Sequence, residues 1–126
     1  FITAYPWSAG FGTKYSDPST LPSNVCQNTL FSPDGADTFT VNNSSPFVLA
    51  YPWSAGFGTK YANPATLPAG AGTGLAFLPS GADIFVAHSV TPFITAYPWS
   101  SGFGTKYANP ASLPAGDSNG VSATTV

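Results

Sequence analysis

The sequence predicts an all-β protein built from tandem copies of one unit, and two observations lead to this prediction. The eleven residues YPWSAGFGTKY at positions 5–15 return unchanged at 51–61, and return with one substitution, Ser101, at 97–107. Thirteen prolines and thirteen glycines interrupt every stretch that is long enough for a helix. Short segments of strand-forming residues remain between these interruptions, as in β-rich repeat proteins.

The repeat divides the chain into about 2.7 units of 46 residues, which span 1–46, 47–92 and 93–126. A fixed period of this size is typical of solenoids, propellers and arrays. The whole chain therefore belongs to one repeat architecture.

Each full unit contains four segments with the length and composition of strands. They read GLAFLPSG at 74–81, ADIFVAHS at 82–89, PFITAYPWS at 92–100 and GFGTKYANP at 102–110. Side chains in 93–100 alternate between two faces, and both faces are apolar, which favours a sheet packed between two neighbouring sheets. Pro6, Pro52 and Pro98 lack a donor N–H, so we expect them at strand ends or bulges.

A compact turn joins the first two strands of a unit. In SPDG at 32–35, Pro33 presets φ, Asp34 can cap its own backbone and Gly35 accepts a positive φ. The second unit has LPSG at 78–81, which keeps the proline and the glycine.

Four strands in about 46 residues, repeated in tandem, are typical of the blades of a β-propeller. The segment FSPDGADTFTVNNSSPFVLAYPWS resembles the strand–SPDG–strand–strand core of WD40-like blades. The near-identical units resemble the highly repetitive propeller arrays of bacteria and their viruses. The resemblance implies four-stranded antiparallel sheets. No Gly-His pair precedes the first strand and Pro-Trp-Ser replaces the Trp-Asp pair, so the hydrogen-bonded tetrad of that family is not carried over.

The strand order starts in the middle of a blade, so we expect an incomplete ring in one chain. Phe1 enters at a third strand, and a lone first strand, GVSATTV, closes the chain at 120–126 after two full blades, for about 11 strands in all. Closed propellers have about 4–8 blades. We therefore expect head-to-tail oligomers, with a dimer of about six blades favoured over a trimer of about eight or nine, or neighbouring blades in a longer chain. The composite blade would lack a second strand.

The candidate ligand-binding residues recur once in each unit: the tryptophan, the tyrosine two residues before it, and the lysine. They are Tyr5, Trp7, Lys14, Tyr51, Trp53, Lys60, Tyr97, Trp99 and Lys106. The aromatic residues either fill the space between adjacent blades or stack on sugar rings, which would make a multivalent lectin. The lysines are either solvated side chains on an outer edge strand or a ring of charges that binds an anionic ligand.

No residue pattern indicates catalysis, a metal or a cofactor. His88 has no nucleophile or carboxylate partner in a motif, and Cys26 is a single cysteine without metal-ligand spacing. Asp34 belongs to a turn, and Asp37 and Asp83 are expected to cap the turn before the second strand. The acids therefore do not form the pair that glycoside hydrolysis needs. We expect a protein that is not an enzyme, with a hydrolase as the third possibility after the scaffold and the lectin.

Charge and hydropathy limit the partners. Three lysines, no arginine and a net charge of −2 provide no basic patch for nucleic acid, and no run of 18 apolar residues could span a membrane. The predicted function is a structural or recognition scaffold whose partner is another copy or neighbouring blades, with glycans as the partner of the lectin alternative. Low charge and the propeller resemblance favour an extracellular, surface or virion protein.

Overall fold

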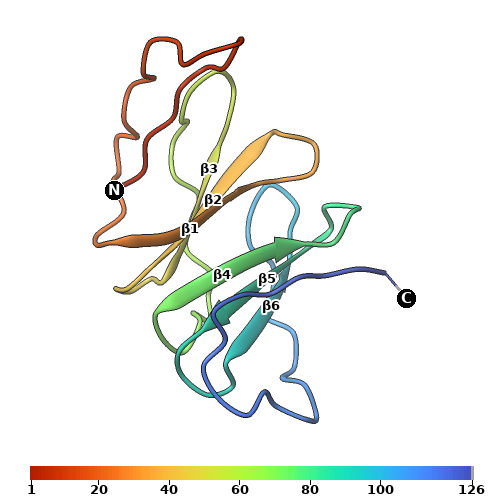
Figure 1. Ribbon diagram of the computed structural model, residues 1–126. Coiled ribbons are helices and arrows are strands. Elements are labelled where there is room, and N and C mark those ends of the chain that lie inside the picture. Colours follow the sequence, from red (N-terminus) through yellow and green to blue (C-terminus); the bar gives the residue numbers. More distant parts are fainter. Residues whose placement is uncertain (126) are drawn as a thin grey trace.

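Six strands form two antiparallel three-stranded sheets in the computed structural model, which describes residues 1–125 and has no helix among them (Figure 1). The first sheet contains β1 (Cys26–Phe31), β2 (Asp37–Asn42) and β3 (Val48–Pro52), and the second contains β4 (Gly72–Phe77), β5 (Asp83–His88) and β6 (Ile94–Pro98). In both sheets the strands lie side by side in chain order. The predicted all-β class is confirmed.

The two sheets have the same register. Phe39 pairs with Ala50 in the first sheet, and Phe85 pairs with Ala96 in the second. Both sheets also carry an irregularity at the start of their first strand, before Asn28 and before Gly74. Residues 46 positions apart therefore occupy equivalent places, and one sheet can serve as a template for the other.

The turn between β1 and β2 has the predicted chemistry. The Ser32 hydroxyl donates a hydrogen bond of 2.6 Å to Oδ1 of Asp34, and the Ala36 amide donates to the same oxygen at 3.0 Å. The Ser32 hydrogen bond, followed by the Ala36 bond, lowers the pKa of Asp34. Gly35 has φ of 74°, a left-handed conformation that glycine adopts without steric cost.

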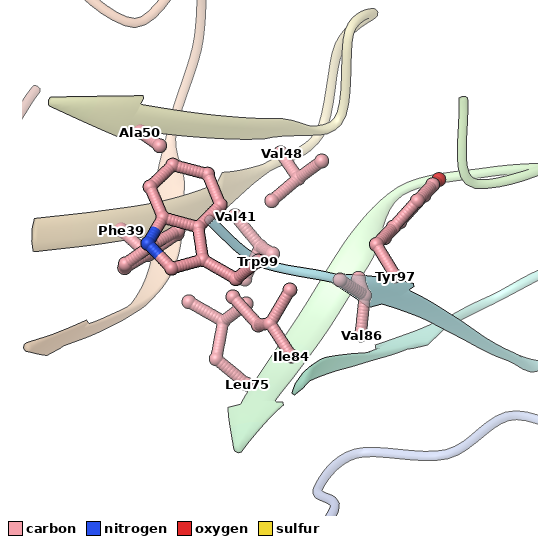
Figure 2. Close-up of a cluster of buried hydrophobic side chains, with 9 residues drawn as sticks. All are labelled: Phe39, Val41, Val48, Ala50, Leu75, Ile84, Val86, Tyr97 and Trp99. Carbon is pink, nitrogen blue, oxygen red and sulfur yellow. The ribbon is translucent and has the colours of Figure 1, made fainter. Parts of the chain in front are cut away.

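The core lies between the two sheets. Phe39, Val41, Val48 and Ala50 of the first sheet face Leu75, Ile84, Val86 and Tyr97 of the second, and Trp99 completes the cluster (Figure 2). Both faces of the first sheet are covered, because the N-terminal segment packs on its other face through a hydrogen bond of 2.8 Å from the Tyr51 hydroxyl to the Thr20 carbonyl. Burial of apolar area is the main source of stability in such a stack.

The prediction of a fourth strand in each blade is wrong. Residues 102–110 and the equivalent 56–64 form no strand, and the sheets have three strands each. We call residues 56–64 and 102–110 the returning segments. Two backbone hydrogen bonds connect the first of them to β3, from the Gly58 amide to the Pro52 carbonyl at 2.8 Å and from the Tyr61 amide to the Ala50 carbonyl at 2.9 Å. Pro52 ends β3, as predicted, and has no N–H to continue the ladder.

The two predicted strands at the ends of the described chain are also wrong. Residues 1–6 and 120–125 form no strand, and Val126 lies outside the described residues. Strands β1 and β4 each pair with the second strand of their own sheet. The segments 1–6 and 118–125 have no equivalent of β2 or β5 to pair with. Their backbone is therefore irregular. The C-terminal segment still lies along β4, where the Thr73 hydroxyl donates to the Ser118 carbonyl (Figure 1).

Candidate functional site

A tight turn between a tryptophan and a phenylalanine is the most regular feature of the repeat. We call it the aromatic turn, and it occurs three times, as Trp7–Phe11, Trp53–Phe57 and Trp99–Phe103. In each copy the two residues form an isolated antiparallel bridge, and their rings meet edge to face at a centroid distance of 5.1 Å. Edge-to-face contact is a favoured geometry for aromatic pairs.

Backbone features explain why the turn has this sequence. Ala55 has φ of 52° and Gly56 has φ of 146°, so the chain reverses within two residues of positive φ. A Cβ placed on Gly58 would lie 2.6 Å from Cγ of Pro52, which is too close for any side chain. Glycine at this position therefore lets the returning segment lie against the proline ring.

The third aromatic turn is inserted against the first sheet. The Trp99 ring lies edge to face with Phe39 at 4.6 Å and with Tyr61 at 5.1 Å, and Ala50 lies beside the indole (Figure 2). Its Nε1 donates a hydrogen bond of 3.1 Å to Oδ2 of Asp37. We call the surface formed by Asp37, Phe39, Ala50 and Tyr61 the first acceptor site.

Asp37 is the polar centre of the first acceptor site. Its Oδ1 accepts a hydrogen bond of 2.7 Å from the Tyr61 hydroxyl, so each carboxylate oxygen has a donor although the residue is buried. Desolvation, assisted by the hydrogen bond to Asp37, raises the pKa of Tyr61 to about 12. The tyrosine therefore remains a donor at neutral pH. A satisfied buried carboxylate orients the indole as well as holding it.

The second sheet carries an equivalent but unfilled surface. Asp83, Phe85, Ala96 and Tyr107 occupy the corresponding positions, and we call them the second acceptor site. The Tyr107 hydroxyl donates to Oδ1 of Asp83 at 2.7 Å, and this hydrogen bond, followed by desolvation, raises the pKa of Tyr107. Among residues 1–125, no donor lies within hydrogen-bond distance of the other oxygen, Oδ2. An open apolar hollow of about 250 Å³ lies over Phe85, Ala96 and Tyr107.

The three tryptophans differ in burial because their indoles contact different surfaces. Trp99, in the first acceptor site, is 8% exposed. Trp53 is half-buried, with Tyr15 and Phe31 edge to face at 5.2 and 5.3 Å. Trp7 is 69% exposed. The same turn is thus seen fully docked, half docked and free.

The predicted tyrosines behave in the same graded way. Tyr51 and Tyr97 are completely buried, and the Tyr97 hydroxyl donates to the Thr66 carbonyl at 2.6 Å. Burial raises the pKa of Tyr51 to about 12 and raises that of Tyr97 as well. Tyr5 is exposed. Of the three predicted tyrosines, only Tyr5 is accessible to a ligand outside the chain.

Each predicted lysine contacts the side chain three residues later in the chain. Lys14 forms an ion pair of 2.6 Å with Asp17. Lys60 donates to Oδ1 of Asn63 at 2.5 Å, and Lys106 donates to Oδ1 of Asn109 at 2.6 Å. Each ammonium group has a partner three residues ahead, so local contacts account for the repeated lysine.

His88 lies in the interior at the end of β5. It is fully buried, and its Nε2 lies 2.9 Å from the hydroxyl oxygen of Thr95. Its Nδ1 has no partner among the described residues, and the same holds for the amide of the equivalent Asn42. Burial lowers the pKa of His88. The sequence offered no catalytic partner for His88, and it did not predict this burial.

Two kinds of feature are absent from residues 1–125, a metal-binding cluster and a membrane-spanning helix. No group of three or more His, Cys, Asp or Glu side chains there is placed to hold a metal ion. None of these residues belongs to a helix long and apolar enough to cross a membrane. In comparisons with known proteins, no protein-family model and no curated protein matches the chain.

The carboxylates of the acceptor sites are the site residues that the sequence analysis missed. Asp37 and Asp83 were expected to cap a turn, and instead they receive side-chain donors from other segments. One signal was available, because an aspartate recurs at the equivalent positions 37 and 83 in a chain with few charges, and each unit has two tyrosines and one tryptophan to serve as donors.

Proposed function

We propose that this protein is a non-enzymatic repeat module whose sheets are blades of a β-propeller-like array. In this proposal further copies extend the array head to tail, or neighbouring units of a longer chain do so. The module then acts as a structural or recognition scaffold that presents equivalent surfaces. The proposal builds on the WD40-like resemblance of the repeat, with blades of three strands and one irregular returning segment.

One observation carries this proposal. The stack has complementary open ends, since the free aromatic turn of Trp7 lies at one end and the unfilled second acceptor site lies at the other. Surfaces that match each other but lie on different parts of a molecule generate rings or filaments of copies. An exposed apolar surface of this kind marks an interaction site.

Native mass tests the proposal directly. We expect size-exclusion chromatography with light scattering to give a native mass that is an integral multiple of 12.9 kDa. This mass should rise with protein concentration, and we expect a dimer in preference to a trimer. A mass of one chain at every concentration up to the solubility limit would contradict self-assembly.

A second candidate function is a carbohydrate-binding lectin. Three exposed aromatic side chains, Tyr5, Trp7 and Phe11, are near neighbours and offer flat apolar faces on which sugar rings can stack. Tyr97 and Trp99 are buried in the equivalent place, so a lectin would use the N-terminal cluster and not one site per unit. Glycan-array binding that disappears in Trp7→Ala, while native mass stays unchanged, would favour the lectin over the scaffold.

A further inference from the structure

We infer that the second acceptor site binds the aromatic turn Trp7–Phe11 of a second copy of this chain, with Nε1 of Trp7 donating to Oδ2 of Asp83. This inference rests on the proposed self-assembly and names the contact that produces it. The chain already contains one docked copy of the same pair of surfaces, formed by Trp99 and the first acceptor site.

The docked copy defines the expected contacts. Trp99 and Phe103 both meet Phe39 edge to face, at 4.6 and 6.2 Å, and the indole N–H reaches the Asp37 carboxylate at 3.1 Å. Residue for residue, the second acceptor site offers Phe85 and Asp83 in the same strand and at the same register. The receiving surface therefore has the same chemistry in both sheets.

The incoming segment is also equivalent. Residues 5–15 differ from 97–107 only at position 9, which is Ala in one and Ser in the other. The bridge between Trp7 and Phe11 is already formed, and Phe11 is 80% exposed. A preformed turn loses little conformational entropy on binding, which favours association.

The second acceptor site has room for an indole. Its hollow of about 250 Å³ is lined by Phe85, Ala96 and Tyr107. A dry cavity of about 150 Å³ is enough to hold benzene. Ala96 pairs with Phe85 and so lies on the same face of the sheet, as Ala50 does beside Trp99.

The polar part of the site is also prepared. Tyr107 already donates to Oδ1 of Asp83, which leaves Oδ2 free to accept from an indole N–H, as Oδ2 of Asp37 does. A hydrogen bond to a carboxylate is stronger than one between neutral groups. An aliphatic side chain would fill the hollow but would leave this oxygen without a donor.

Tyr5 offers a third contact in the same interface. In the docked copy, the Tyr97 hydroxyl donates to the carbonyl of Thr66, in the link that follows the first sheet. The residue equivalent to Thr66 after the second sheet is Ser112, which is exposed. We expect the Tyr5 hydroxyl of the incoming copy to donate to the Ser112 carbonyl.

Two variants remove opposite halves of the contact. Trp7→Ala removes the incoming indole, and Ala96→Phe fills the second acceptor site from within. Each alone should weaken self-association by roughly thirtyfold or more, measured by sedimentation equilibrium, because a buried tryptophan is a typical hot spot. Val90→Ala, which changes an exposed apolar residue outside both surfaces, should associate as the wild type does. Circular dichroism and thermal midpoints verify that each variant is folded.

A mixture of the two variants gives the decisive measurement. Trp7→Ala keeps an intact acceptor site and Ala96→Phe keeps an intact aromatic turn, so the mixture should form a one-to-one pair that neither variant forms alone. Failure of the mixture to pair, after each variant has lost self-association, would overturn the head-to-tail contact. Wild-type assembly that both variants retain would overturn this inference and leave the proposed self-assembly standing. A wild type that stays monomeric would overturn both.

Discussion

Nε1 of Trp99 donates a hydrogen bond of 3.1 Å to Oδ2 of Asp37, a residue 62 positions earlier in the chain. The contact joins the residue after β6 to the first residue of β2, so it holds the second sheet against the first. Tyr61 completes the arrangement by donating to the other carboxylate oxygen. The packing of the two sheets therefore depends on a carboxylate that the first sheet supplies to the tryptophan that follows the second sheet.

Truncation of Trp99 should destabilise the isolated chain far more than truncation of Trp7. Trp99→Ala removes a buried indole and its hydrogen bond, and we expect a loss of about 3–5 kcal/mol in the free energy of unfolding. Trp7→Ala is the matched control, because the same side chain is exposed there and should change stability by less than about 0.5 kcal/mol. Urea denaturation of dilute, monomeric samples measures both values, and equal losses would contradict the packing role of Trp99.

Removal of the Asp37 carboxylate should leave two donors without a partner. In Asp37→Ala, the Tyr61 hydroxyl and the Trp99 indole N–H both lose their acceptor in a buried site, at a cost of about 1–3 kcal/mol for each unsatisfied group. Asp83→Ala is the control at the equivalent, partly open position, and in monomeric samples it should be milder. Denaturation midpoints compared at one pH provide the test, and a control variant as damaged as Asp37→Ala would contradict it.

Local chemistry made much of the fold predictable. The period of 46 residues, the three regular strands of each sheet and the turn at Asp34 and Gly35 all follow from short-range patterns of apolar, proline and glycine residues. The fourth strand could not be excluded from the same patterns, because residues 102–110 have strand-forming composition. What prevents that strand is the proline that ends β6 and the aromatic turn after it, which leave only two backbone hydrogen bonds for the returning segment.

The candidate site was predictable only in its residue types. The tryptophan of each unit, and the tyrosine two residues before it, indicated either packing between repeats or stacking on a ligand. The partner of the tryptophan, Asp37, could not be found from spacing, because the contact depends on how two sheets stack and not on neighbouring positions in the chain. Trp7 and Trp99 lie in segments 5–15 and 97–107, which differ at one position only, and the difference in their burial has the same origin.

Alanine at Gly58 should test the close approach within the aromatic turn. Its Cβ would lie 2.6 Å from Cγ of Pro52 and 3.2 Å from the Pro52 carbonyl oxygen, so the returning segment would have to move. We expect Gly58→Ala to cost about 1–3 kcal/mol, as other overpacked sites do. Gly10→Ala is the control, since nothing lies within 4 Å of its added Cβ. Thermal denaturation should separate the two variants by several degrees, and a neutral Gly58→Ala would contradict the steric argument.

Stability should fall in mildly acidic solution because of His88. Burial lowers the pKa of this side chain in the folded state below its unfolded value of about 6.5. As the pH falls below about 6.5, the unfolded chain therefore binds a proton that the folded chain does not, and stability declines by up to about 1.4 kcal/mol per pH unit until the folded pKa is reached. His88→Asn, which places the residue found at the equivalent position 42, should remove this part of the pH dependence. Urea midpoints between pH 7.5 and 5 measure it, with the slope and not the absolute stability as the readout. A wild-type slope equal to that of His88→Asn would show that the buried imidazole does not control acid stability.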